Sequence, residues 1–372
     1  MSNDRQKCFF LRFLVLFVAV LLSSCASSSY LAVSSDRGPA GGVYEVKNGK
    51  AQPVAALPSM YHLVRDPRSE NLYYGTFIQK PASAVRKDRI GAAAVLERIS
   101  ADTLKPVQTR PVGGQTPCFA TLSPDGGFLY TANYSSGDVS ELPLYRGRFS
   151  GPPRSIRQTG QGVTRRQKSP HPHCVLFDPA GRQLYVSDLG TDQIWIYRWT
   201  PEKGVELPCA EKLKLPPGSG PRHLVFDPSG LVLYTANELN STAASFVRDS
   251  LRSPWKPGPV CSTLPEGVSG EKNYPGAIKI TADGRFFFVT NRGHDSIAVF
   301  EAARNGGFKL LRTVPSGGKY PSDLLLLNHG TQLAVIHYRE GGVTLFDLDP
   351  ATGTLTRKAG DIPVPRGLSL CE

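Results

Sequence analysis

Short apolar runs rich in Val, Ile, Leu, Phe and Tyr alternate along the chain with tight polar turns built from Gly, Pro, Asp and Asn. One unit recurs: an apolar run, a turn such as Asp-Pro-x-Gly, and a second apolar run. Its clearest copies are residues 118–133, 174–188, 224–237 and 278–291, with weaker copies at 62–74 and 325–336. Two strands joined by a tight turn form a β-hairpin, so each copy predicts one hairpin.

The copies repeat every 47 to 57 residues, and a second hairpin usually follows each one. Four strands in about 50 residues is typical of one blade of a β-propeller. Residues 30–33 and 42–46 predict the outer strands of one more blade, and the tail over residues 355–370 would supply its inner strand. The sequence therefore predicts an all-β, seven-bladed β-propeller with four-stranded blades over residues 30–372.

Other architectures fit less well. A β-sandwich array does not require a strict four-strand repeat. A Rossmann fold would need a GxGxxG motif after a strand together with helical periodicity, and the sequence offers neither. The Trp-Asp dipeptide of the WD40 class is also absent.

The N-terminus has a separate pattern. Arg5, Lys7 and Arg12 precede an uninterrupted apolar run over residues 13–22. That run is too short to cross a membrane, which needs about 20 apolar residues, and it has the form of a secretory signal. The residues Leu22-Ser23-Ser24-Cys25 resemble a bacterial lipobox, in which the cysteine is acylated.

We therefore expect residues 1–24 to be a lipoprotein-type signal peptide and Cys25 to be the lipidation site. The alternative is an ordinary signal peptide with an incidental cysteine. The lipoprotein interpretation predicts an exported protein of a bacterial cell envelope, anchored in the membrane through its N-terminal lipid and facing the periplasm. Ala26 after the cysteine, in place of Asp, favours the outer membrane.

Composition narrows the function. The sequence contains 37 glycines and 31 prolines among 372 residues. The combined share of Gly and Pro is well above the usual ~12 %, which excludes a helical bundle. The formal charge of +12 favours an anionic ligand. The basic residues are scattered without an aromatic–basic motif, so no nucleic-acid partner is expected. The five cysteines after Cys25 lack metal-ligand spacing, and neither a metal site nor a disulfide is predicted.

Propeller geometry indicates where a site would lie. The start of each inner strand and the end of the next strand meet on one face, around the central funnel. The predicted positions are mostly ionisable or hydrogen-bonding residues: His171, His173, Arg222, His223, Tyr274 and Tyr320 at the starts, and Tyr134, Asp188, Glu238, Arg292 and Arg339 at the ends. Loops are polar in general, but so many His, Arg and acidic residues around one axis favour a functional site.

These positions resemble the lactonase propellers, a family that includes 6-phosphogluconolactonases and fungal carboxy-muconate lactonising enzymes. The matching stretches are residues 169–175 with 188–192, Gly220-Pro-Arg-His223 onward to Phe226, 237–240, and Asn291-Arg292 with 295–297. The resemblance covers roughly residues 30–372. It implies His173, Arg222, Glu238 and Arg292 as catalytic residues, and chemistry without a metal or organic cofactor.

Around these four, His171, Asp188, Tyr134 and Arg339 are predicted to bind substrate. For Asp188 the alternative is a structural carboxylate that accepts backbone hydrogen bonds. His223 follows Arg222 directly and is expected to point to the other side of its strand. His171 and His173 share a face, which is weak support for a metal site.

Lactone hydrolysis needs an activated water, oxyanion stabilisation and an acid for the leaving alkoxide. Glu238 or His173 suits the role of general base, and Arg222 and Arg292 suit the oxyanion or a substrate anion. The competing interpretation is that Arg222 and Glu238 form a structural ion pair.

The sequence thus predicts a lactone hydrolase resembling 6-phosphogluconolactonase that opens a sugar-acid or carboxylated lactone, acting as a monomer on a small anionic substrate. Two features depart from the family: residues 322–324, Ser-Asp-Leu, replace its seventh-blade pattern, and the export signal disfavours a phosphorylated substrate. The alternative function is a non-catalytic cell-envelope scaffold that binds a partner in the funnel.

Overall fold

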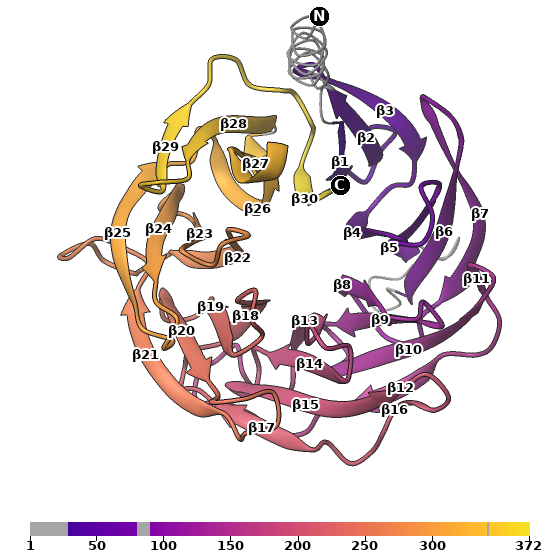
Figure 1. The fold of residues 1–372 in the computed structure, drawn as a ribbon. Coiled ribbons are helices and arrows are strands. Elements are labelled where there is room, and N and C mark those ends of the chain that lie inside the picture. The colour runs from indigo at the N-terminus through magenta and orange to yellow at the C-terminus, as the bar shows by residue number, and fades with distance from the viewer. Residues whose placement is uncertain (1–28, 80–89, 341) are drawn as a thin grey trace, which may run out of the picture.

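The computed structural model describes residues 29–79, 90–340 and 342–372. Within these ranges the chain forms seven antiparallel sheets arranged in a ring around a central axis (Figure 1). One short 3-10 turn, η1 (Asn328–Gly330), is the only helical element of the described ranges. The predicted seven-bladed, all-β propeller with four-stranded blades is confirmed.

We number the blades from the N-terminus and give the strands of each from the axis outward. Blade 1 is β30 (Gly367–Cys371), β1 (Tyr30–Ser34), β2 (Gly42–Lys47) and β3 (Lys50–Ala56); blade 2 is β4 (Met60–Arg65), β5 (Leu72–Gln79), β6 (Ile90–Ser100) and β7 (Thr103–Pro111). Blade 3 is β8 (Pro117–Leu122), β9 (Phe128–Asn133), β10 (Asp138–Tyr145), and β11 (Arg148–Phe149) with β12 (Arg154–Arg157). Blade 4 is β13 (Pro172–Phe177), β14 (Gln183–Asp188), β15 (Gln193–Thr200), and β16 (Gly204–Val205) with β17 (Glu211–Lys214).

Blade 5 is β18 (Pro221–Phe226), β19 (Val232–Asn237), β20 (Thr242–Val247) and β21 (Lys256–Ser262). Blade 6 is β22 (Tyr274–Ile280), β23 (Phe286–Arg292), β24 (Ser296–Ala302) and β25 (Phe308–Pro315). Blade 7 is β26 (Lys319–Leu327), β27 (Gln332–Glu340), β28 (Gly342–Asp349) and β29 (Thr354–Arg357).

The last strand of the chain closes the ring. β30 pairs antiparallel with β1, with Leu31 opposite Cys371 and Val33 opposite Ser369. Figure 1 shows this strand, in yellow, as the inner strand of the blade whose other strands are indigo. The predicted closure by the C-terminal tail is therefore correct, and the two ends of the described chain hold each other in place.

The repeated turns between the first two strands of a blade have a local cause. In blade 4 the Asp178 carboxylate accepts backbone N–H groups of Arg182 and Gln183, and in blade 5 Asp227 does the same for Val232. Gly181 and Gly230 have φ values of 66° and 69°, which glycine adopts without steric cost. The turn sequence therefore reverses the chain with its polar groups satisfied.

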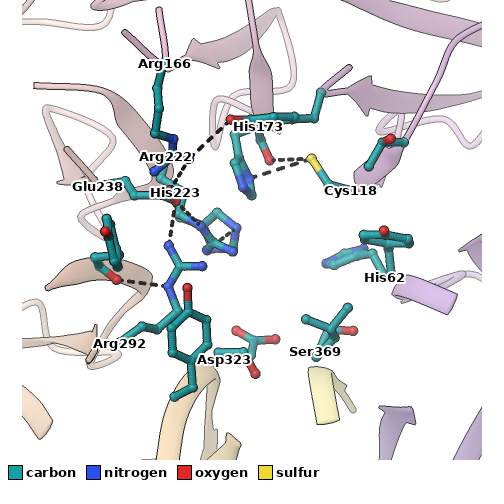
Figure 2. Close-up of a pocket in the computed structure, with 17 residues that line it drawn as sticks. His62, Cys118, Arg166, His173, Arg222, His223, Glu238, Arg292, Asp323 and Ser369 are labelled. Atoms are coloured by element: carbon teal, nitrogen blue, oxygen red, sulfur yellow. Dashed lines mark hydrogen bonds and ion pairs between the residues drawn. The ribbon is translucent and has the colours of Figure 1, made fainter. Parts of the chain in front are cut away.

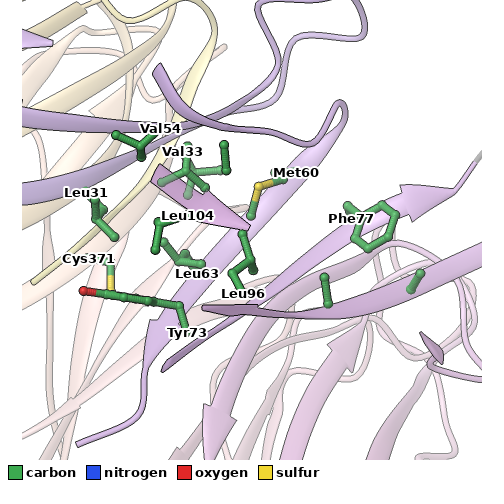
Figure 3. Packing of buried hydrophobic residues seen from close by; sticks show 14 residues of the cluster. Leu31, Val33, Val54, Met60, Leu63, Tyr73, Phe77, Leu96, Leu104 and Cys371 are labelled. Carbon is green, nitrogen blue, oxygen red and sulfur yellow. The ribbon is translucent and has the colours of Figure 1, made fainter. Parts of the chain in front are cut away.

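Packing between neighbouring blades forms the core. Seven clusters of buried apolar side chains fill the spaces around the ring. Figure 3 shows the cluster between blades 1 and 2, where Leu31, Leu63, Leu96 and Cys371 meet across the closing strands. Because each blade contributes to two such clusters, the ring as a whole positions the residues at the axis.

Strand register defines two faces. The innermost strand of each blade begins opposite the end of the second strand, as with Pro117 and Asn133 or Pro221 and Asn237. The funnel face carries these ends, and the other face carries the hairpin turns. Tyr30 precedes Leu31, which pairs with Cys371 at the end of the innermost strand of blade 1. Tyr30 therefore lies on the turn side.

The predicted signal peptide and lipidation site, residues 1–24 and Cys25, lie outside the described residues. In the part of the chain that the structure describes, no helix has the length and apolar character needed to cross a membrane.

Candidate active site

A cavity of about 410 Å³ lies at the axis on the funnel face. All seven blades contribute to its wall, and most of the wall comes from the first residues of the innermost strands (Figure 2). The cavity is lined by all four residues that the family resemblance implies as catalytic: His173, Arg222, Glu238 and Arg292. These four residues are separated by up to about 120 positions in the sequence, so only the closed ring brings them together.

A β-bulge near the start of every innermost strand shapes this wall. The paired positions skip one residue on the inner strand, as where Pro221 and His223 face Asn237 and Ala236 with Arg222 left over. A bulge inserts an extra residue and re-aims its side chain. The extra residues in six blades all line the cavity: Tyr61, Cys118, His173, Arg222, Ser322 and Leu368. In blade 6 the same position is Gly276, with Ala277.

The bulge explains why the expectation for His223 was wrong. Strict alternation would turn His223 away from the side that Arg222 faces, yet both residues line the cavity. His62, Asp323 and Ser369, which also follow a bulged residue, line it too. None of these three was predicted, because a bulge has no reliable signal in a single strand's sequence.

Glu238 lies at the centre of a cluster of three arginines. Its Oε2 is 2.5 Å from a terminal nitrogen of Arg292 and 3.1 Å from Nε of Arg222, and its Oε1 is 2.6 Å from Arg166. The Glu238, Arg222 and Arg292 side chains are at most 10 % exposed, whereas Arg166 is 44 % exposed at the mouth. Three positive charges against one carboxylate leave the cluster cationic.

Charge decides the protonation of this cluster. Burial by itself would raise the pKa of Glu238, but the neighbouring charges of Arg292 and Arg222 outweigh it and lower the pKa well below its ordinary value. Burial, together with the charge of Arg292, lowers the pKa of Arg222 to about 10. Glu238 is therefore ionised and Arg222 is charged at neutral pH, and the ion pair that the sequence left open as an alternative is present.

The arginines are held in fixed orientations. Arg292 donates from Nε to the Tyr274 carbonyl oxygen at 2.9 Å, and its guanidinium lies over the ring of Tyr320. The Nε of Arg222 is buried and lies 3.1 Å from Oε2 of Glu238 in an ion pair, and Nη1 of Arg222 donates to Nε2 of His223 at 2.9 Å. Arg222 therefore holds a fixed positive charge at the cavity wall.

Arg166 was not predicted as a site residue. It belongs to a basic segment, residues 165–168, whose sequence is typical of a solvated loop but which lies just before the predicted site and could attract anions. In the structure it reaches Glu238 from blade 4 and lies over the Tyr274 ring. The pair Arg165-Arg166 close before the His173 strand is the one sequence signal that could have indicated it.

Three imidazoles form an aromatic tier beside the arginines. His173 contacts His223 edge to face, His223 contacts Phe119 edge to face, and His62 stacks on Phe119. Burial, with the charge of Arg222, lowers the pKa of His173 and of His223 well below the ordinary value. These rings are therefore neutral at pH 7, and Figure 2 shows His173 pointing into the space beside Cys118 and Arg222.

The four predicted substrate-binding residues have different positions. Tyr134 lines the cavity and its hydroxyl lies 3.2 Å from Arg166. His171 is outside the lining: its ring stacks on Tyr134 and its Nδ1–H donates to the Tyr134 carbonyl oxygen at 2.7 Å. Arg339 is exposed and covers the ring of Tyr320.

Asp188 is also outside the cavity lining, for a reason that the repeat makes clear. It occupies the same register position as Asn133, Asn237 and Asn291. Asp188, Asn133 and Asn237 each lie opposite the proline that begins the innermost strand, whereas Asn291 lies opposite the second residue of its innermost strand, Pro275. All four are fully buried. Asp188 accepts the N–H groups of His171 and Gly190, so it fixes the loop in place.

Among the described residues, no group of three or more His, Cys, Asp or Glu side chains has an arrangement that would hold a metal ion. His171 and His173, which share a face in the sequence, diverge in the fold, since His171 stacks outside on Tyr134 while His173 lines the cavity. The cysteines of the described ranges form no disulfide with one another.

Comparison with known proteins identifies relatives of the same architecture. Residues 44–371 match the family described as lactonase, 7-bladed beta-propeller. A Bacillus subtilis protein named 6-phosphogluconolactonase is 32 % identical over 256 residues, which is 68 % of this chain and 72 % of that protein.

Solved structures of similar proteins have the same fold. The periplasmic gluconolactonase of Pseudomonas aeruginosa superposes with a TM-score of 0.82 at 25 % identity, covering 92 % of this chain and 98 % of that one. A Lactobacillus plantarum protein superposes with a TM-score of 0.83 at 24 % identity and the same coverage, which supports the fold alone.

Proposed function

The chain belongs to the lactonase family of seven-bladed β-propellers, and we propose that it is a lactone hydrolase that opens a sugar-acid or carboxylated lactone. The observation that carries this proposal is the cationic cluster of Arg166, Arg222 and Arg292 beside neutral His173 in one cavity. An anionic substrate is attracted by the arginines, and a neutral imidazole accepts a proton from water. The relatives named as gluconolactonases support the same chemistry.

In the proposed reaction His173 is the general base. A neutral imidazole has a free lone pair, whereas the carboxylate of Glu238 is occupied by three guanidinium groups. His173 removes a proton from water as its oxygen attacks the lactone carbonyl carbon. When the ring C–O bond breaks, the same imidazolium returns the proton to the leaving alkoxide, so atoms and charge balance.

Arg222 stabilises the oxyanion in this scheme. Its guanidinium lines the cavity and is fixed by Glu238 and His223, and fixed groups directed at developing charge are usually the largest single contribution to catalysis. Arg292 and Arg166 bind the anionic group of the substrate. Glu238 is then a positioning residue that keeps the arginines close to one another.

The first experiment measures acid release in a pH-stat with gluconolactone, 6-phosphogluconolactone and a carboxylated muconolactone. Turnover above the spontaneous rate that is lost in His173→Gln and in Arg222→Ala would support the proposal. Glu238→Gln separates the two possible bases: a shifted pH profile would make Glu238 the base, whereas a uniform loss fits positioning. Absence of turnover on all three lactones would favour the scaffold function.

We also propose export and lipid anchoring at Cys25. Tyr30 lies at the turn face, and four residues separate it from Cys25, so the five Cα–Cα steps between them reach at most ~18 Å. The funnel would then open away from the membrane, toward soluble substrates. Membrane fractionation tests this directly, since Cys25→Ser should move the protein from the membrane to the soluble periplasmic fraction.

A further inference from the structure

Arg166 lies at the mouth of the cavity and contacts residues of three blades. It pairs with Glu238 of blade 5 at 2.6 Å, donates to the Tyr134 hydroxyl of blade 3 at 3.2 Å, and lies over the Tyr274 ring of blade 6. Figure 2 shows its side chain extending from its own loop toward Arg222. A long side chain that is 44 % exposed loses much conformational entropy in such a position. Other contacts must therefore hold its backbone in place.

Gln167, the next residue, provides these contacts. Its side chain is fully buried, and its amide nitrogen donates to the Leu189 carbonyl oxygen at 2.9 Å and to the Asp192 carboxylate at 2.7 Å. Its amide oxygen accepts the Thr164 N–H at 3.1 Å. A glutamine amide has two N–H donors and one oxygen, so both donors and the oxygen are engaged. The loop is therefore anchored directly beside Arg166.

Asp192 carries the connection on to blade 5. It is buried, and its carboxylate accepts the backbone N–H of Gly220 at 2.7 Å in addition to the Gln167 amide. Gly220 stands two residues before Arg222, and its carbonyl oxygen accepts the backbone N–H of Glu238 at 2.8 Å. One carboxylate thus joins the loop of Arg166 to the strand start that carries Arg222.

Blade 6 shows which part of this arrangement is general. Asp192 and Asp295 each precede the third strand of their blade, and both have a φ of 57°. The Asp295 carboxylate accepts the N–H of Tyr320, two residues before the bulged residue of blade 7, just as Asp192 accepts that of Gly220. Holding the start of the next blade is therefore a task of this position in both blades, and the bond from Gln167 is the additional feature of Asp192.

Glu238 also lies between the two arginines, but it does not fix Arg166 by itself. An ion pair with a partly exposed partner contributes little, because water screens it and the long side chain loses freedom. A substrate anion also competes with Glu238 for the Arg166 guanidinium. Gln167 and Asp192 are outside the cavity lining, so a ligand at the mouth leaves their bond intact.

We propose that Gln167 and Asp192 are positioning residues that fix Arg166 and Arg222 relative to each other. A fully satisfied buried polar network makes its surroundings rigid. In the proposed reaction Arg166 binds the anionic group and Arg222 stabilises the oxyanion, so the distance between them selects substrates in which these two groups are correctly spaced. The pair rests on the proposed function for its role in turnover, but not for its effect on anion binding.

A double-mutant cycle on binding tests the coupling without turnover. The full-length protein is titrated calorimetrically with inorganic phosphate, as wild type, Arg166→Ala, Gln167→Leu and the double variant. We expect each single substitution to weaken phosphate about three- to tenfold. The double variant should stay within about twofold of Arg166→Ala, because Gln167 acts through Arg166. Losses that multiply in the double variant, or wild-type protein that binds no phosphate, would overturn the assignment.

A second variant moves Gln167 without removing it. A Cβ added at Gly162 would lie 2.6 Å from the Gln167 side chain, so Gly162→Ala should give the same non-additive pattern with Arg166→Ala. Gln158→Leu is the matched control, since Gln158 is a buried glutamine of the same connection that donates to the Tyr197 hydroxyl instead. It should lower the melting temperature and leave phosphate affinity within about twofold. An equal loss of affinity in the control would show general destabilisation and refute positioning.

Asp192→Asn extends the test to Arg222. An amide nitrogen cannot accept backbone N–H groups, so this variant loosens both the loop of Arg166 and the strand start of blade 5. We expect it to weaken phosphate further in the Arg166→Ala background. Asp178→Asn, which changes a buried carboxylate that accepts two backbone N–H groups at a hairpin turn, is its control. No further loss in the Arg166→Ala background would remove Arg222 from the coupling.

Kinetics separate this proposal from the hydrolase. Where a lactone is turned over, Gln167→Leu should raise KM more than it lowers kcat, because Arg166 contacts the anionic group and not the reacting carbonyl. A fall in kcat at unchanged KM would contradict this. A non-additive phosphate cycle without turnover of any lactone would leave the positioning pair and remove the hydrolase. Turnover together with multiplying losses would leave the hydrolase and remove the pair.

Discussion

At the scale of single residues, the surroundings of Glu238 and His173 support the different roles that we propose for them. The two side chains look equally suited to act as a base in the sequence, because both residue types serve this purpose in enzymes. In the fold Glu238 contacts three arginines, whereas His173 is buried and neutral. The proposal of His173 as base and Glu238 as positioning residue therefore rests on environment and not on residue type.

Removing Arg222 should abolish most of the activity. Arg222→Ala deletes the fixed guanidinium at the cavity wall, so we expect kcat to fall about 10²–10³-fold. Arg148→Ala is the control, since Arg148 forms an exposed ion pair with Glu97 away from the funnel. A loss below about tenfold in the Arg222 variant would mean that another group stabilises the oxyanion.

The pH dependence of kcat/KM should report His173. Its pKa is lowered well below the ordinary value, first by burial and then by the charge of Arg222, and the base is active when neutral. We expect kcat/KM to stay level as the pH falls from 8 through 6.5 and to decline only at lower pH. An acidic limb centred at or above pH 6.5 would rule out His173 as the base.

At the scale of elements, the bulge in each innermost strand is the device that builds the site. A regular strand would direct alternate residues to the cavity, but the bulge lets two consecutive residues face it, as with Arg222 and His223. The hairpins themselves were predictable, because turn residues and apolar alternation are local. The bulges were not, since they are imposed by the pairing partner.

Gly276 tests how closely the blade 6 bulge positions Arg292. A Cβ at this residue would lie 2.5 Å from the Thr290 Oγ1 and 3.2 Å from the Arg292 Nε. We expect Gly276→Ala to displace Arg292 and to lower kcat/KM about tenfold to a hundredfold. Steady-state kinetics checks this.

The control is Gly258→Ala in the outer strand β21, where an added Cβ would press on the Ser245 hydroxyl instead. It should lower the melting temperature without changing kcat/KM per folded molecule. Equal kinetic losses in both variants would show that the effect of Gly276 is general destabilisation.

At the scale of the whole molecule, the closed ring makes the site depend on both ends of the described chain. β30 completes blade 1, contributes Leu368 and Ser369 to the cavity and packs Cys371 into the cluster between blades 1 and 2. Stability and function are therefore coupled through the last strand.

Deleting residues 367–372 should prevent stable folding. The truncation exposes the edge of β1 and the apolar cluster beside it, and an exposed edge strand promotes aggregation. We expect loss of soluble protein and of a cooperative thermal transition. Deleting Glu372 alone, which is outside the strand, should preserve the soluble protein and its cooperative thermal transition. A variant without residues 367–372 that is soluble and unfolds cooperatively would refute the role of closure.

Acid should destabilise the protein before carboxylates protonate. Burial lowers the pKa of four histidines: His62, His173, His223 and His337. The unfolded chain therefore binds more protons than the folded one as the pH falls below about 6.5. Each contributes roughly 1 kcal/mol per pH unit in that range. Asp188 and Asp323, whose pKa values burial raises, oppose this in part.

Thermal melts at pH 7.5, 6 and 5 check this, with a steady fall in the melting temperature expected. His62→Gln should reduce the slope, because it removes one of the four imidazoles. A melting temperature that stays constant or rises toward pH 5 would contradict the balance of these groups.

The sequence by itself determined the hairpin repeat, the number of blades, the closure by the C-terminal tail and the positions of His173, Arg222, Glu238 and Arg292 at the funnel. These follow from local alternation, turn chemistry and a fixed repeat, which a single chain displays directly. The choice of these four among the funnel residues came from the resemblance to the lactonase family. The tertiary structure alone decided that Arg166 joins Glu238, that His223 faces the cavity, and that Asp188 fixes a loop instead of lining the site. It also decided which groups are charged, because burial and neighbouring charges exist only once distant blades have closed around the axis.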